Sequence, residues 1–186
     1  MRRRSVFAHA IHLPHDAWRR LARAEAAVAH CPTSNLFIGS GLYDLRAADA
    51  ARVRTGLGTD VGGGDSFSLL RTLNEAYKVQ QLQRHTVSPE RMLYLATLGG
   101  ARALDLEASI GNFRPGKEAD LVVLDDAATP LLARRSAMAR TRSAASTGDR
   151  AGGWQERLFA LMMLGDERAV AETRIMGRAV ASPADG

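Results

Sequence analysis

The chain has 186 residues, a formal net charge of +5 and a single cysteine, Cys31. This length allows a domain with a real core, and one cysteine excludes an internal disulfide, which suits a reducing compartment such as the cytoplasm. The basic residues are mostly scattered arginines and no apolar run reaches the roughly 18 residues of a membrane span, so neither nucleic acid nor a membrane is an expected partner.

Residues 5–10 are short and apolar and predict a buried strand with His9 at its carboxyl end. A core strand this close to the first residue suggests that a preceding segment is missing. Pro14 marks the start of a helix, because proline is favoured in a first helical turn. Residues 26–30 predict the next strand, which ends at His30.

The segment after His30 is expected to be a loop. Cys31, Pro32 and the small polar residues after them favour a tight, hydrogen-bonded turn, and the loop is expected to continue through residues 36–41. Cys31 is a weak candidate for a nucleophile, because no base partner is evident. Residues 45–51 predict a short helix.

A third strand begins at Val53 and passes into a glycine loop, Gly56-Leu57-Gly58-Thr59-Asp60-Val61-Gly62-Gly63-Gly64. A lone carboxylate, Asp60, therefore lies where a strand gives way to a turn. In α/β proteins ligands bind at the carboxyl ends of parallel strands, so we interpret Asp60 as a metal ligand and proton acceptor. An equally weighted alternative is a helix-capping aspartate in a strand-to-helix turn.

Three successive strands thus end near a polar residue: His9, His30 and Asp60. Strands that alternate with helices predict a parallel sheet of the α/β class. Three such units are too few for a closed eight-stranded barrel and would form part of one. A packing role is the competing interpretation for His9, and we favour that role for His30.

The second half of the chain predicts helices over residues 67–84, capped by Ser66, and from Ser88-Pro89 onwards. Residues 121–124 predict a strand, 154–164 a helix and 170–180 a closing hairpin. Residues 134–153 have few large apolar side chains and are expected to form a mobile loop. We therefore divide the chain into domains at 1–104 and 105–186.

Five segments carry a resemblance to a known family: FAH (7–9), AHCPTSNLFIGSG (29–41), GLGTDVGGGDSFSLLRTLNEAYKVQQL (56–82), ATLGGARAL (96–104) and IGNFRPGKEADLVVLD (110–125). They resemble the carboxy-terminal half of the guanine deaminases, zinc enzymes of the amidohydrolase superfamily. The resemblance implies the last three βα units of a (β/α)₈ TIM barrel in the first domain. It implies part of a small β-sandwich in the second.

The resemblance also implies residue roles. Asp60 would bind Zn²⁺ and take a proton from its water, and His9 would orient that water and polarise the purine. His30 would lie nearby as a support. The implied reaction converts guanine and water to xanthine and ammonia, with zinc lowering the pKa of water to about 7.

The family's other zinc ligands are absent, since the sequence contains no His-x-His pair. A single carboxylate does not hold zinc tightly, so a truncated chain is expected to be incomplete as an enzyme. The expected partner is a second copy in a homodimer or a missing amino-terminal half. Two alternatives stay open: an inactive remnant that acts as a binding module, and another purine or triazine aminohydrolase.

Overall fold

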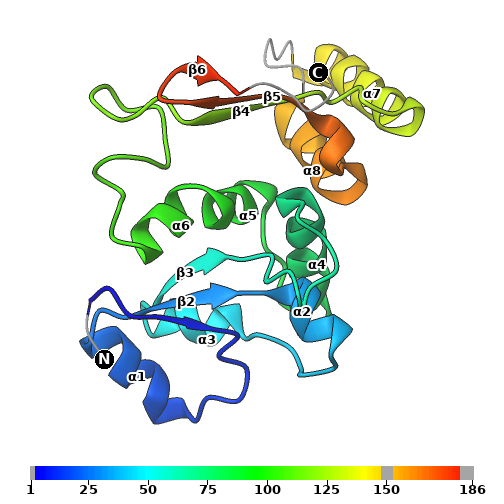
Figure 1. Ribbon diagram of the computed structural model, residues 1–186. Coiled ribbons are helices and arrows are strands. Elements are labelled where there is room, and N and C mark those ends of the chain that lie inside the picture. Colours follow the sequence, from blue (N-terminus) through cyan, green and yellow to red (C-terminus); the bar gives the residue numbers. More distant parts are fainter. Residues whose placement is uncertain (1–2, 148–152, 181–186) are drawn as a thin grey trace. The chain divides into compact units, whose positions relative to one another are not determined.

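A parallel sheet of three strands organises the first part of the chain, in the order β1-β2-β3. The computed structural model describes residues 3–147 and 153–180. It places the strands at β1 (Val6–Ala8), β2 (Ala27–His30) and β3 (Arg54–Leu57), as Figure 1 shows. The mixed α/β class predicted from the sequence is confirmed.

Contacts divide the chain into two compact units, Met1–Gly111 and Asn112–Gly186. The first unit contains the parallel sheet and the helices α1 to α6. No helix in the described part of the chain combines the length and the apolar character that a membrane span requires.

Helices connect the three strands, as the alternating pattern predicts. Between β1 and β2 lies α1 (His15–Arg23), which Pro14 precedes and which buries Trp18 and Leu21. Between β2 and β3 lie α2 (Pro32–Phe37) and α3 (Leu45–Ala50). Connections of this kind are what parallel neighbours require, because the chain must return to the starting edge of the sheet.

Three further helices complete the first unit: α4 (Leu69–Leu82), α5 (Pro89–Ala96) and α6 (Leu98–Ala103). The hydroxyl of Ser88 caps α5 as predicted, whereas Ser68 rather than Ser66 caps α4. Helix α6 packs on β3. The two elements approach so closely that a Cβ on Gly56 would lie 2.9 Å from the Cα of Gly100.

A guanidinium joins four segments of the first unit. Arg54 on β3 donates hydrogen bonds to the carbonyl oxygens of Arg3 (2.5 Å), Arg102 (2.8 Å) and Glu25. The Asp105 carboxylate lies 3.7 Å from the same guanidinium and accepts a hydrogen bond from Arg3 at 2.8 Å. The start of the chain, the turn before β2, β3 and the end of α6 are therefore held together at one point.

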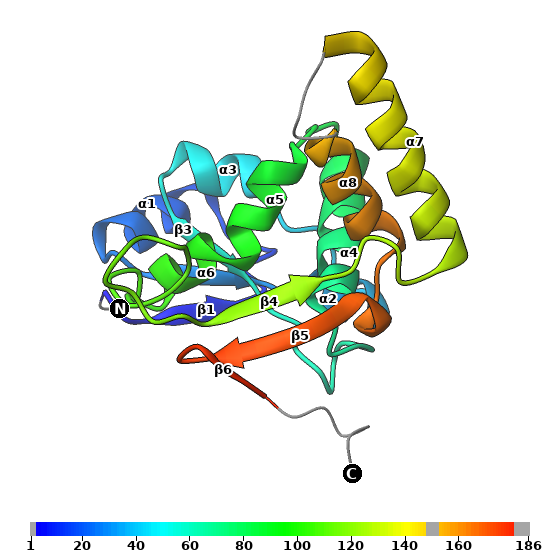
Figure 2. The same ribbon diagram turned by 90° about the horizontal axis from the view of Figure 1, so that it is seen from above.

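The second unit is built on an antiparallel sheet in the order β4-β5-β6. Its strands are β4 (Leu121–Leu124), β5 (Val170–Ile175) and β6 (Arg178–Ala179), and β4 and β5 run side by side in Figure 2. The predicted strand and hairpin are confirmed. The hairpin turns at Met176 and Gly177, which both have positive φ, as a tight two-residue turn requires.

Helices α7 (Pro130–Thr147) and α8 (Trp154–Leu164) pack against each other, and a 3₁₀ turn, Glu167–Ala169, leads into β5. The predicted helix over residues 154–164 is confirmed. Between the two helices, the Asp126 carboxylate accepts hydrogen bonds from Arg140 (3.1 Å) and Arg157 (2.5 Å).

Three predictions of local structure are wrong. The loop expected over residues 134–153 is helical up to Thr147, and residues 148–152 lie outside the described part of the chain. Alanine is the strongest helix former, and α7 buries a stripe of modest size at Leu132, Ser136 and Ala139 instead of a row of large apolar side chains.

The loop expected after His30 contains helix α2, with Pro32 in its first turn, where its missing N–H costs nothing. The strand expected to be buried at residues 5–10 is exposed in β1, where Phe7 is 41% exposed. This strand pairs only with β2, so one of its edges has no neighbour among the described residues.

Candidate functional site

Three side chains that can bind a metal meet where the parallel strands end. His9 follows β1, Cys31 follows β2, and Asp60 lies in the loop after β3. One ligand atom from each of them lies within 4.8 Å of the other two. The structure therefore brings together His9 and Asp60, the two site residues predicted from the sequence, and adds Cys31.

The His9 and Asp60 side chains face each other. Nε2 of His9 lies 3.7 Å from Oδ2 of Asp60, and each side chain is 39% exposed. Both residues have positive φ, 67° for His9 and 51° for Asp60. Such backbone conformations cost energy in residues other than glycine and are concentrated at functional sites.

The loop after β3 fixes the backbone at Asp60. The Asp60 carbonyl accepts hydrogen bonds from the N–H groups of Gly63 (3.1 Å) and Gly64 (2.6 Å). The Thr33 hydroxyl, from α2, donates to the carbonyl of Thr59 at 3.1 Å. A Cβ on Gly64 would lie 2.2 Å from that same carbonyl oxygen, so the turn in this form requires glycine.

The helix-capping interpretation of Asp60 is wrong. The next helix is α4, which begins at Leu69, and its cap is Ser68, whose hydroxyl accepts from the N–H of Arg71. The Asp60 carboxylate is left to face His9.

Asn35 is a site residue that sequence reasoning missed. Its side-chain oxygen lies 2.7 Å from Nδ1 of His9, within hydrogen-bond distance. Asn35 is 1% exposed and belongs to α2. The signal in the sequence was a polar amide in a segment of small residues, which by itself fits a loop equally well.

Cys31 is buried next to the His9 and Asp60 side chains. Burial, and then the negative charge of Asp60, raise the pKa of its thiol to about 11. The thiol therefore stays protonated near neutral pH, which counts against the nucleophile interpretation, because the thiolate is the reactive form.

His30 is fully buried and is absent from the metal-binding group. Its ring stacks on Tyr43 with a centroid distance of 4.5 Å, and neither ring nitrogen has a hydrogen-bond partner among the described residues. Burial lowers the pKa of His30 to about 3. This environment supports the packing role favoured from the sequence.

The buried His30 predicts a loss of stability in mild acid. As the pH falls below about 6.5, the unfolded chain binds a proton at His30 that the folded chain, with a pKa of about 3, does not bind. The free energy of unfolding should therefore fall by about 2 kcal/mol between pH 7 and pH 5 on account of this group.

Urea unfolding of the unsubstituted chain and of His30→Phe at both pH values measures this effect. Phenylalanine keeps an aromatic ring against Tyr43 but does not titrate, so the acid-induced loss should be smaller in the variant by that amount. Equal losses in the two proteins would show that the pKa of His30 is the same in the folded and the unfolded chain.

The donor set fits part of a zinc site. A carboxylate oxygen and an imidazole nitrogen are ligands that zinc uses, and Nε2 of His9 is the ring nitrogen that Asn35 does not occupy. Structural and catalytic zinc sites take at least three protein ligands. The described residues bring three candidate donors together, of which the Cys31 thiol would have to lose its proton on binding, so they fit part of a site and not the full four-coordinate shell.

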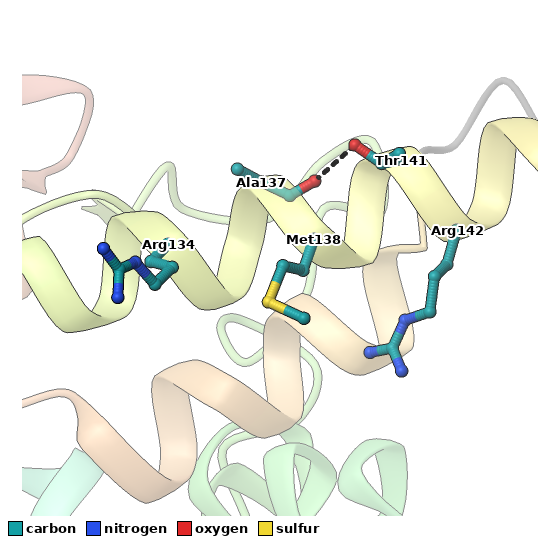
Figure 3. A pocket seen from close by; sticks show the side chains of 5 residues that line it. All are labelled: Arg134, Ala137, Met138, Thr141 and Arg142. Carbon is teal, nitrogen blue, oxygen red and sulfur yellow. Dashed lines mark hydrogen bonds between the residues drawn. The ribbon is translucent and has the colours of Figure 1, made fainter.

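A separate surface pocket lies on α7 in the second unit (Figure 3). All of its lining residues belong to this one helix: Arg134, Ala137, Met138, Thr141 and Arg142. It contains none of the predicted site residues.

Comparison with known proteins gives a consistent set of relatives. The amidohydrolase family model matches residues 2–180. The guanine deaminase of Escherichia coli strain K12 is 47% identical over 175 residues, a match that covers 94% of this chain and 37% of that protein.

Solved structures agree with the sequence matches. The structure of the E. coli guanine deaminase matches with a TM-score of 0.84 and 46% identity, covering 95% of this chain and 38% of that one. The guanine deaminase structure from Bradyrhizobium japonicum matches with a TM-score of 0.80 and 38% identity, covering 95% and 42%. The chain thus spans well under half the length of these relatives.

Proposed function

Since this chain belongs to the amidohydrolase family, we propose that it carries part of the active site of a guanine deaminase, which converts guanine and water to xanthine and ammonia. The observation that carries the proposal is the pairing of His9 and Asp60, whose Nε2 and Oδ2 atoms face each other at 3.7 Å where β1 and β3 end. The family relatives named guanine deaminase support the choice of substrate.

We place this site in part of a (β/α)₈ barrel. Residues 1–104 would form its last three βα units, and residues 105–186 would form part of a small β-sandwich domain. The parallel order β1-β2-β3, with helices between the strands, supports the first assignment. The antiparallel sheet β4-β5-β6 supports the second. A single buried free cysteine supports a cytoplasmic location.

Asp60 would be this chain's ligand to a catalytic Zn²⁺ ion. When bound, zinc makes water a stronger acid and hence a better nucleophile at neutral pH. The other ligands would come from residues outside this chain, either a segment equivalent to the uncovered part of the relatives or a second subunit.

The chain's own residues would manage the protons. His9 would hold the attacking water through Nε2, and Asp60 would accept one of its protons at Oδ2. As the C2–O bond of the product forms and the C2–N bond of guanine breaks, Asp60 would return that proton to the departing nitrogen. The nitrogen then leaves as ammonia, and the second water hydrogen moves from the new oxygen on C2 to ring nitrogen N3, which gives xanthine. General acid–base assistance of this kind requires groups within reach of the reacting atoms, which the half-exposed carboxylate and imidazole allow.

A chimera tests the proposed function. This chain replaces the matching 37% of the E. coli enzyme in one continuous polypeptide, which supplies the remaining residues from a guanine deaminase. Chromatography measures xanthine formed from guanine with zinc present, and the chain alone serves as the comparison. We expect xanthine from the chimera and none from the chain alone. A folded chimera that contains zinc and leaves guanine unchanged would overturn the proposal.

A further inference from the structure

The Asn35 side chain that hydrogen-bonds His9 is held in place by the surrounding structure. The backbone N–H of Asn35 donates to the Cys31 carbonyl at 3.0 Å, and its own carbonyl accepts from the N–H of Ser40 at 2.9 Å. These bonds, together with a burial that leaves 1% of the residue exposed, give the side chain little freedom to move away from His9. Its oxygen lies 2.7 Å from Nδ1.

We propose that Asn35 is a positioning residue that holds His9 in the tautomer with the hydrogen on Nδ1, so that the lone pair of Nε2 faces Asp60. An amide oxygen can only accept a hydrogen bond, so the Nδ1 atom beside it must donate. The other nitrogen of a neutral ring is then an acceptor. This inference rests on the proposed function for its catalytic consequence, but not for the tautomer itself.

The gap between His9 and Asp60 supports this tautomer over the opposite one. If Asn35 presented its NH₂ group to Nδ1, the ring hydrogen would lie on Nε2 and point at Asp60. An N–H donor and a carboxylate oxygen approach to about 2.7–3.2 Å. The observed 3.7 Å between Nε2 and Oδ2 is longer. Such a separation is expected for two acceptors that face each other and have no hydrogen to share.

This tautomer suits the proposed chemistry. A water held between the two acceptors can donate one hydrogen bond to Nε2 and the other to the Asp60 carboxylate. This orientation directs a lone pair of the water oxygen towards the substrate. Without Asn35, a hydrogen on Nε2 would bond to the carboxylate directly and occupy the proton acceptor. Loss of such a supporting residue typically lowers activity by about 10–100-fold.

Nitrogen NMR measures the tautomer directly. The chain carries ¹⁵N-labelled histidine, and magic-angle spinning records the spectrum at pH 8 whether or not the protein associates. The His9→Gln variant identifies the His9 signals by their absence. We expect a protonated Nδ1 and an unprotonated Nε2. The reverse pattern in the unsubstituted chain would overturn the proposal without any other variant.

Three substitutions test the role of the Asn35 side chain. Asn35→Leu, similar in size but unable to accept, should lose the Nδ1–H tautomer, while Asn35→Asp, which keeps an oxygen beside Nδ1, should retain it. Ser34→Ala is the matched control, because Ser34 is also buried in α2 but its hydroxyl has no hydrogen-bond partner within residues 3–147 and 153–180. An unchanged tautomer in the leucine variant would contradict the proposal.

The kinetic readout separates this inference from the proposed function. In the chimera, Asn35→Leu should lower kcat by about 10–100-fold with little change in KM, and Asn35→Asp should restore most of it. If the chimera does not deaminate guanine, the proposed function fails and the tautomer result stands. If the chimera is active and the leucine variant keeps its kcat, the positioning role fails alone.

Discussion

Replacing Asp60 with asparagine should lower guanine turnover by the chimera by about 10²–10⁴-fold, the range typical for loss of a general acid–base group. The amide is nearly the same size as the carboxylate, so the loop after β3 should keep its form. The amide cannot take up the proton from water, and it is a poorer zinc ligand than a carboxylate. We therefore expect a lower zinc content as well as a lower kcat.

Asp65→Asn is the matched control for this substitution. Asp65 lies five positions along the same glycine-rich loop, and its exposed carboxylate is 3.9 Å from the guanidinium of Arg71. An exposed ion pair of this length contributes little to stability. Turnover and zinc content should stay near those of the unsubstituted chimera. Equal effects of the two substitutions, or full activity of Asp60→Asn, would rule out the assigned role.

Gly64→Ala should lower guanine turnover although it alters neither His9 nor Asp60. The added Cβ would lie 2.2 Å from the carbonyl oxygen of Thr59, a distance that no van der Waals contact allows. The turn must open, and the 2.6 Å hydrogen bond from Gly64 to the Asp60 carbonyl is then lost. A displacement of about 1 Å at a reacting group can cost about 10²-fold in rate, so we expect a loss of that order in kcat.

Gly100→Ala is the corresponding control. Its Cβ would meet only the carbonyl oxygen of Leu95, at the ordinary contact distance of 3.7 Å, and alanine is a better helix former than glycine in α6. Urea unfolding and guanine turnover of both chimeras measure the contrast. We expect Gly64→Ala to be destabilised by about 1–3 kcal/mol and Gly100→Ala to match or exceed the unsubstituted protein. Normal turnover in Gly64→Ala would show that the turn does not position Asp60.

The meeting of His9 and Asp60 was predictable because it follows from topology. Each residue comes shortly after a short strand, and parallel strands end at the same edge of a sheet. The caps of the later helices were also local signals, although Ser68 rather than Ser66 caps α4. A capping hydroxyl bonds a backbone N–H only three residues further along the chain, so the local sequence is enough to predict it.

What could not be predicted depends on contacts between distant residues. The partner of Asn35 is 26 positions away, and only the fold reveals that an amide in a segment of small residues supports a histidine. Helix α7 was missed because its buried stripe becomes visible only when α8 packs against it. The exposure of β1 likewise depends on which strands lie beside it, and the sequence of a strand does not specify its neighbours.

Because Arg54 joins four segments, proteolysis at this residue reports how often the first unit opens. Arginines are abundant and scattered, so trypsin has many sites on the surface of the chain. A protease must draw an arginine side chain into its specificity pocket, and the Arg54 guanidinium is held by the carbonyl oxygens of three other segments. Cleavage after Arg54 therefore requires all three to release it at once. The rate of that one cut follows the opening of the first unit as a whole, whereas cuts at exposed arginines follow only local motion.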